Sequence, residues 1–142
     1  MVLVVLSTGC SGLKTYPADA GGNLAVRAQL DGAVRATLHV HRVDAQCRTE
    51  YRGSVPLERP VALLNVPAGE TSYLVATFDT SSFLSGSRST NAGALLRPAA
   101  GRSYELALRY RDDIYDVSLR EVDARGTSRE IPRRDLGACR GS

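Results

Sequence analysis

The stretch LAVRAQLDGAVRATLHVHRV, residues 24–43, decides the fold class of this 142-residue chain. Apolar residues occupy every second position from Leu24 to Leu30 and again from Val34 to Val40, with mainly polar residues between them. A repeat of two residues is typical of β-strands that bury one face. The Asp31–Gly32 pair between the two runs is typical of a tight hairpin turn. We therefore expect two strands that contact a core and are joined as a hairpin.

The rest of the chain continues this pattern. No window has a helical repeat, and turn residues recur at intervals typical of short strands. We expect seven further strands, around residues 47–52, 61–66, 72–78, 94–97, 103–110, 115–122 and 129–132. The sequence therefore predicts an all-β fold, a single antiparallel β-sandwich of about seven to nine strands that spans residues 23–142.

Two segments of the chain resemble each other. Residues 67–78, PAGETSYLVATF, align with residues 99–110, AAGRSYELALRY, and each is an Ala-Gly turn followed by a strand. With only two copies this is not a solenoid repeat. We expect the two strands to be equivalent edges of the two sheets.

The same segments, VPAGETSYLVATF and LLRPAAGRSYELAL, resemble small bacterial lipoproteins that have transthyretin-like or carboxypeptidase-regulatory-like sandwich domains. In those families a Pro-x-Gly turn precedes a central strand, and a second Ala-Gly turn precedes the next Tyr-containing strand. The resemblance implies the sandwich fold. It implies no particular function, because sandwiches of this kind carry many unrelated ones.

The N-terminus resembles a lipoprotein signal. LSTGC, residues 6–10, is similar to the lipobox, in which small residues precede the cysteine that receives the lipid. The pattern departs from the family because the apolar run is short, no basic residue precedes it, and Ser7 stands where leucine is usual. The resemblance implies that residues 1–9 are a signal peptide, which is a truncated one if the true translation start lies upstream, and that Cys10 carries acyl chains such as palmitate. The alternative is a first strand with Cys10 in the core.

Residues 10–22 lack periodicity and contain Pro17, Gly21 and Gly22, so we expect a flexible tether between the lipid and the domain. Ser11 follows the cysteine, where aspartate in known lipoproteins signals retention in the inner membrane. The resemblance therefore implies an anchor in the outer membrane, facing the periplasm. No other segment approaches the length of a membrane-spanning helix.

The chain has three cysteines. If Cys10 is acylated, Cys47 and Cys139 remain as an even pair in an oxidising compartment, where disulfides form. The alternative is two unrelated thiols. Because neither has a CxxC neighbour, redox catalysis and a zinc site are not indicated.

The candidate binding loop is DTSSFLSGSRSTNAG, residues 79–93. Long loops without secondary structure are uncommon in compact domains and are often functional. Phe83, Leu84 and Arg88 are its candidate binding residues. The alternative is that Phe83 folds back and covers the end of the core.

Two other groups of polar residues are candidate metal ligands, each with a simpler interpretation. His39 and His41 lie on one face of a strand and could bind a transition metal, or they are part of a solvated surface. Asp112, Asp113 and Asp116 could bind calcium, but their spacing is not that of a calcium loop, and a polar hairpin accounts for them. The sequence therefore predicts no metal site and no cofactor.

Composition and motifs limit the function classes. A net charge of +3 does not favour nucleic-acid binding. No nucleophile elbow, zinc-protease motif or phosphate-binding loop occurs, so we expect no catalytic residues and no enzyme. We expect a membrane-anchored periplasmic lipoprotein that binds an envelope protein or assists envelope assembly. The alternatives are an accessory lipoprotein of a type VI-like secretion system, and an envelope hydrolase or hydrolase inhibitor.

Overall fold

The computed structural model describes residues 14–84 and 86–140. The predicted signal peptide and Cys10 lie outside the described residues. The described part contains nine strands and one short helix: β1 Leu24–Leu30, β2 Arg35–Val43, β3 Thr49–Pro56, β4 Val61–Leu64, β5 Thr71–Ser82, β6 Gly86–Leu96, β7 Ser103–Arg111, β8 Ile114–Val122, β9 Ser128–Ile131 and α1 Gly137–Arg140. No helix in these ranges is long and apolar enough to cross a membrane.

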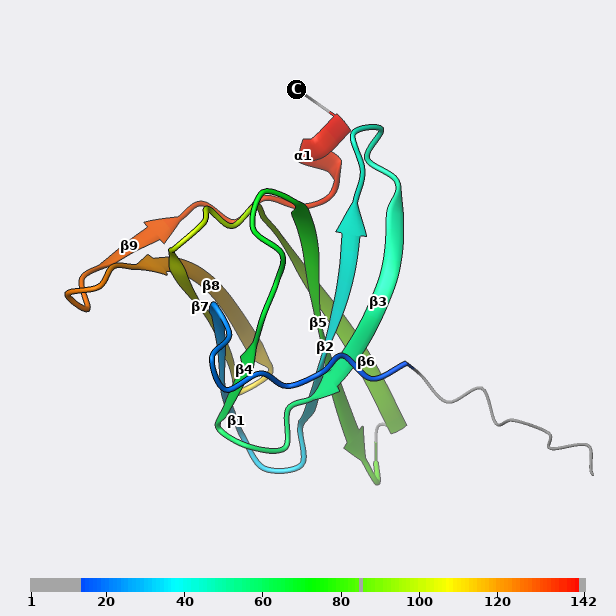
Figure 1. Ribbon diagram of the computed structural model, residues 1–142. Coiled ribbons are helices and arrows are strands. Elements are labelled where there is room, and N and C mark those ends of the chain that lie inside the picture. Colours follow the sequence, from blue (N-terminus) through cyan, green and yellow to red (C-terminus); the bar gives the residue numbers. More distant parts are fainter. Residues whose placement is uncertain (1–13, 85, 141–142) are drawn as a thin grey trace, which may run out of the picture.

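The strands form two sheets that pack face to face (Figure 1). One has five strands in the order β4-β1-β7-β8-β9, and the other has four in the order β3-β2-β5-β6. The prediction of an all-β sandwich of about seven to nine strands is confirmed.

The first two strands are connected differently from the prediction. β1 belongs to the five-stranded sheet and β2 to the four-stranded sheet, so the Asp31–Gly32 turn crosses between sheets and does not form a hairpin. The turn itself is present, because the Val34 amide donates to the Asp31 carbonyl and Gly32 has a φ of 50°. Both strands face the same core from opposite sides, and a crossover satisfies their alternation as well as a hairpin does.

One strand pair departs from the predicted antiparallel arrangement. β1 pairs in parallel with β7, in a register that runs from Leu24 opposite Tyr104 to Leu30 opposite Tyr110. The other named strand pairs of the described chain are antiparallel. β1 lies between β4 and β7, and its successor β2 belongs to the other sheet, so no hairpin requires β1 to be antiparallel to the strand beside it.

The core is a single apolar cluster between the sheets. Every strand except β3 and β9 contributes at least one buried side chain to it. It includes Leu24, Leu38, Leu74, Phe78, Leu106, Leu108 and Leu119, each at most 1% exposed. Burying such side chains contributes about 1.5–3 kcal/mol each relative to exposure. The alternation read from the sequence is therefore the pattern of residues that face this cluster.

The two similar segments form the strands β5 and β7. Gly69 and Gly101 have φ values of 79° and 74° in the turns that precede these strands, a conformation that favours glycine. The two strands are equivalent, as expected, but they are not edges. β5 lies between β2 and β6, and β7 lies between β1 and β8.

The described part of the predicted tether, residues 14–22, lies against the sandwich. The Tyr16 amide donates to the Ser54 carbonyl, and the Ser54 amide donates to the Lys14 carbonyl. Farther along, the Asp19 amide donates to the Leu63 carbonyl. Residues 14–22 are therefore bound to the edges of β3 and β4, which differs from the expected flexible tether.

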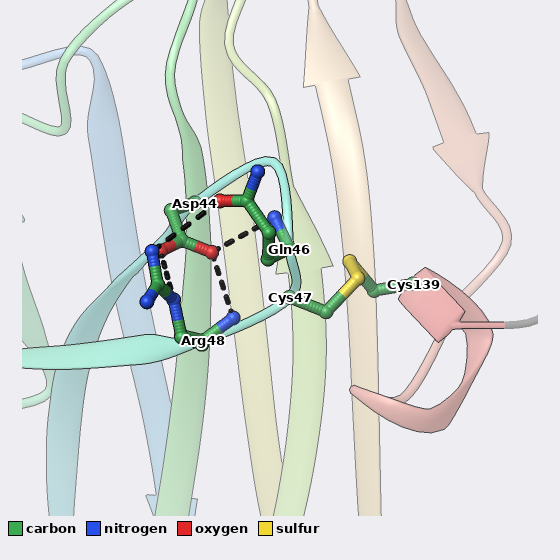
Figure 2. The surroundings of a disulfide bond; sticks show 5 residues. All are labelled: Asp44, Gln46, Cys47, Arg48 and Cys139. Atoms are coloured by element: carbon green, nitrogen blue, oxygen red, sulfur yellow. Dashed lines mark hydrogen bonds and ion pairs between the residues drawn. A yellow bond between two sulfur atoms is a disulfide. The ribbon is translucent and has the colours of Figure 1, made fainter.

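A disulfide joins Cys47 to Cys139, with 5.8 Å between their Cα atoms, and confirms the predicted pair. It links the turn between β2 and β3 to α1 (Figure 2). Cys47 has a φ of 60°, and the turn is held by Asp44. The Asp44 carboxylate accepts the Gln46 and Arg48 amides at 2.9 Å and the Arg48 guanidinium at 2.8 Å.

Candidate binding cleft at one end of the sandwich

The predicted loop at residues 79–93 is a β-hairpin. β5 and β6 pair without a register shift from Ser72 opposite Leu96 to Ser82 opposite Gly86. The neighbouring strand β2 begins opposite Asp79, so the hairpin extends beyond the sheet (Figure 1). The sequence does not show these strands because both faces of the extension are exposed, and hydroxyl side chains replace the apolar alternation.

The hairpin tip carries two exposed apolar side chains. Phe83 is 104% exposed and Leu84 is 95% exposed, relative to their reference states. The alternative in which Phe83 covers the core is therefore wrong. The ring that fills this end of the core is Phe78, which is 1% exposed.

The turn between β7 and β8 lies beside the same end of the core. Its central residues, Asp112 and Asp113, have φ values of 52° and 62°, as a two-residue type I′ turn requires. Directly after the turn, Ile114 is 71% exposed and Tyr115 is 40% exposed. Sequence reasoning missed these two apolar residues, although their position just after a turn was a usable signal.

The three aspartates of this region do not converge. Asp113 accepts a hydrogen bond from the Tyr110 hydroxyl at 3.2 Å, and Asp112 forms an exposed ion pair with Arg111. Asp116 is in cross-strand register with Arg109. Among the described residues no group of three histidine, cysteine or acidic side chains could hold a metal ion. The observed arrangement is that of a polar hairpin.

A cleft of about 450 Å³ lies between the two hairpins and the turn at residues 31–34. Its lining brings together Arg88, from the predicted binding loop, with Tyr110, Asp112 and Asp113. A second cleft of about 750 Å³ shares Arg88 with the first and is also lined by Ser87 and Ser89 of β6. Candidate residues from two separate parts of the sequence thus meet at one end of the sandwich.

Aromatic rings form the boundary between the core and this cleft. The Phe78 ring lies 5.8 Å from the Tyr110 ring and 5.7 Å from the Tyr115 ring, between ring centroids. Burial of the Tyr110 ring raises the pKa of its hydroxyl, and Asp113 raises that pKa further, while the positive charge of Arg88 lowers it. The Tyr110 hydroxyl therefore stays protonated at neutral pH as a hydrogen-bond donor.

Arg88 is the basic residue that lines this cleft. Within the described part of the chain, no ion pair or side-chain hydrogen bond involves its guanidinium. A guanidinium presents five donors, which suit a carboxylate or a backbone carbonyl of a bound molecule. The cleft therefore combines one available cation with hydroxyl-rich walls, and the exposed apolar side chains lie on the hairpins outside its lining.

The histidines lie elsewhere, on the outer face of the four-stranded sheet. The His41 ring lies 5.4 Å from the Tyr51 ring and 6.3 Å from the Tyr73 ring, and the His39 ring lies 6.3 Å from the Tyr51 ring. Burial, and then the neighbouring His39, lower the pKa of His41. Both histidines are thus half-buried in an aromatic surface, which is less solvated than the simpler interpretation of the sequence supposed.

Comparison with protein-family models and with curated proteins finds no match to this chain. The arrangement of its own residues is therefore the basis of the functional proposal.

Proposed function

We propose that this protein is a non-catalytic binding module of the bacterial envelope, anchored to the outer membrane by lipid on Cys10. Its partner is an envelope protein, which it contacts through the hairpin tips and the cleft at one end of the sandwich.

The observation that carries the proposal is the exposure of Phe83 and Leu84. Two long strands hold these side chains beyond the sheet, where they are almost completely accessible to solvent. Ile114, at 71% exposure, adds an apolar side chain on the other hairpin. Apolar side chains grouped at one end of a domain and surrounded by polar residues are typical of a protein contact site.

Two sequence features support the location. The lipobox-like LSTGC at residues 6–10 contains the cysteine for lipid attachment. The Cys47–Cys139 disulfide is typical of an oxidising compartment such as the periplasm.

The chemistry of the cleft supports binding. The Tyr110 hydroxyl donates a hydrogen bond to the Asp113 carboxylate, so these two groups present a polar, hydrogen-bonded pair at the cleft. Arg88 supplies charge for recognition. The histidines, which would be the usual proton-transfer groups, lie on the outer sheet face.

Site-specific cross-linking tests the partner. A photoreactive amino acid is placed at position 83 of the full chain in its native host, and at position 125, in the exposed turn between β8 and β9, as a control. We expect one cross-linked envelope protein from position 83 and none from position 125. The purified partner should bind the wild-type protein, and F83S/L84S should weaken that binding at least tenfold. Equal cross-linking from both positions, or unchanged binding by F83S/L84S, would overturn the proposal.

The intact mass of the protein from the host's membrane fraction tests the anchor. We expect a species that begins at Cys10 and carries the added mass of acyl chains. A species that begins at Met1 with an unmodified Cys10 contradicts the anchor and the location.

A further inference from the structure

β6 is an edge strand with a row of unpaired backbone groups. Its described hydrogen-bonded neighbour is β5 alone, on one side. On the open side the Leu95 amide and the Gly93 carbonyl point outward, because both bond to groups outside the sheet. The continuous register places the amides and carbonyls of Ser87, Ser89 and Asn91 on the same side. Within the described chain these six groups have no hydrogen-bond partner.

The protein already uses the far part of this edge to hold an extended segment. The Leu95 amide donates to the Arg134 carbonyl at 2.8 Å, and the Arg133 guanidinium donates to the Gly93 carbonyl at 3.3 Å. These contacts end at Gly93, so the edge from Gly86 to Asn91 continues an interface that the chain itself occupies only in part.

The inner face of β8 is incompletely covered near the start of the strand. In register with the buried core positions of β7, Leu119 is 1% exposed, Val117 is half-buried and Tyr115 is 40% exposed. Phe78 of β5 already stacks on Tyr115, and β6 is the next strand after β5. A strand added beyond β6 would direct every second side chain to the inter-sheet side, the side on which Tyr115 and Val117 are incompletely covered.

We propose that β6 receives an extended segment of the partner protein as a fifth strand, with apolar side chains at every second position. The segment pairs with the backbone of Ser87, Ser89 and Asn91, and its apolar side chains contact Tyr115 and Val117. Strand addition of this kind takes affinity from backbone hydrogen bonds and specificity from alternate side chains. This inference rests on the proposed function, for which it gives the mode of recognition.

A second copy of the chain fits this position less well. Antiparallel pairing of two β6 strands would direct the inner-face residues Arg88 and Thr90 of one copy toward Tyr115 and Val117 of the other. These polar side chains do not supply the apolar contact that the exposed face of β8 requires.

The test uses a synthetic peptide in which valine and threonine alternate, with lysine at both ends, and a control peptide of the same composition without the alternation. The full chain is titrated with each and followed by amide NMR and hydrogen exchange. We expect the alternating peptide to bind more tightly than the control. Binding should slow exchange at Ser87, Ser89 and Asn91, and should leave Arg88 and Thr90, whose amides face β5, unchanged.

Matched variants at position 89 complete the test. S89P removes an outward amide that no described group uses, and proline is tolerated at such edge positions. S89A removes the hydroxyl and keeps the amide. We expect at least tenfold weaker peptide binding by S89P and unchanged binding by S89A. N91P is the replacement if the NMR spectrum shows that S89P is unfolded.

Strand addition would be overturned by no preference for the alternating peptide, by protection without alternation along β6, or by equal binding by S89P and S89A. Protection of Ser87, Ser89 and Asn91 in a dimer without peptide would instead assign the edge to a second copy, and would also overturn it. F83S/L84S separates the two proposals. Suppose that F83S/L84S binds the peptide, and that the protein with a photoreactive amino acid at position 83 gives no cross-link in the host. The proposed function then fails and strand addition stands.

Discussion

Phe78 and Tyr110 occupy equivalent positions in two similar segments of the sequence, and their rings meet across the core with centroids 5.8 Å apart. Phe78 is on β5, in the middle of the four-stranded sheet, and Tyr110 is on β7, in the middle of the five-stranded sheet. The similarity between residues 67–78 and 99–110 therefore marks two central strands that face each other across the core. Their aromatic ends close the core beneath the candidate cleft.

The two phenylalanines of the chain provide a matched pair of stability variants. Phe78→Ala removes a ring that is 1% exposed, and should lower the free energy of unfolding by about 3–5 kcal/mol. Phe83→Ala removes a ring that is 104% exposed, and should change it by less than about 0.5 kcal/mol. Urea denaturation measures both. A destabilisation of Phe83→Ala comparable to that of Phe78→Ala would contradict the exposed hairpin tip.

The sequence predicts the strands that bury one face. Leu24–Leu30 has the predicted bounds, and Ser103–Arg111 differs from its prediction by one residue, because alternation is strong in both. Alternation does not report which sheet a strand joins. The Asp31–Gly32 turn could therefore be read as a hairpin, and the parallel pairing of β1 with β7 could not be foreseen.

The candidate site was predictable only in part. Phe83, Leu84 and Arg88 were identified from their unusual setting, but the strands that carry them were not, because exposed strands need no apolar period. Tyr110 and Tyr115 join them only through the packing of two hairpins, which local sequence does not encode. The cleft is a property of tertiary structure.

The disulfide should contribute a large share of the stability. It closes a loop with a sequence separation of 92 residues, and cross-linking such a loop stabilises the fold by about 4–5 kcal/mol in the chain-entropy model. The double variant C47S/C139S should lose about that amount, measured by urea denaturation in a C10S background that prevents thiol exchange. A reductant should destabilise the parent by a similar amount and leave the double variant unaffected. A loss below about 1 kcal/mol would contradict this role.

Gly53 should control the attachment of residues 14–16 to β3. A Cβ on Gly53 would lie 2.7 Å from the Tyr16 nitrogen, and Gly53 has a φ of 143°. G53A should therefore displace the segment and break its two hydrogen bonds with Ser54. At about 1 kcal/mol per hydrogen bond, plus backbone strain, the free energy of unfolding should fall by about 2–3 kcal/mol.

Amide hydrogen exchange tests this prediction, with faster exchange expected at Tyr16 and Ser54 in G53A. The control is G126A, since Gly126 also has a positive φ but has nothing within 4 Å of an added Cβ. Equal exchange at Tyr16 and Ser54 in the two variants would show that Gly53 is not what allows the close approach.

Tyr73 and Asp135 should make the stability depend on pH at both extremes. The Tyr73 hydroxyl donates to the Asp135 carboxylate at 2.6 Å, across the sheet face where the C-terminal segment docks. Burial, and then this hydrogen bond, raise the pKa of Tyr73 to about 12. The same hydrogen bond is the main cause that lowers the pKa of Asp135.

The signs of the two effects differ. In the folded state Tyr73 keeps its proton above the ordinary tyrosine pKa of about 10. Its contribution to the free energy of unfolding is therefore complete below about pH 10 and is lost as the pH rises through about 12. Asp135 stays ionised below its ordinary pKa, so its contribution is complete above about pH 4 and is lost as the pH falls through the lowered value.

The variant D135N separates this pair from the other titrating groups. Without the carboxylate, the pKa of Tyr73 should fall from about 12 toward its ordinary value, which the absorbance of ionised tyrosine at alkaline pH reports. The loss of stability between about pH 10 and 12 should then be smaller than in the parent. The reason is that the pKa of Tyr73 in the folded state would lie closer to its pKa in the unfolded state, so the two states would differ less in bound protons. An unchanged alkaline titration in D135N would mean that burial alone holds the Tyr73 proton, and that the contact with the C-terminal segment contributes nothing to it.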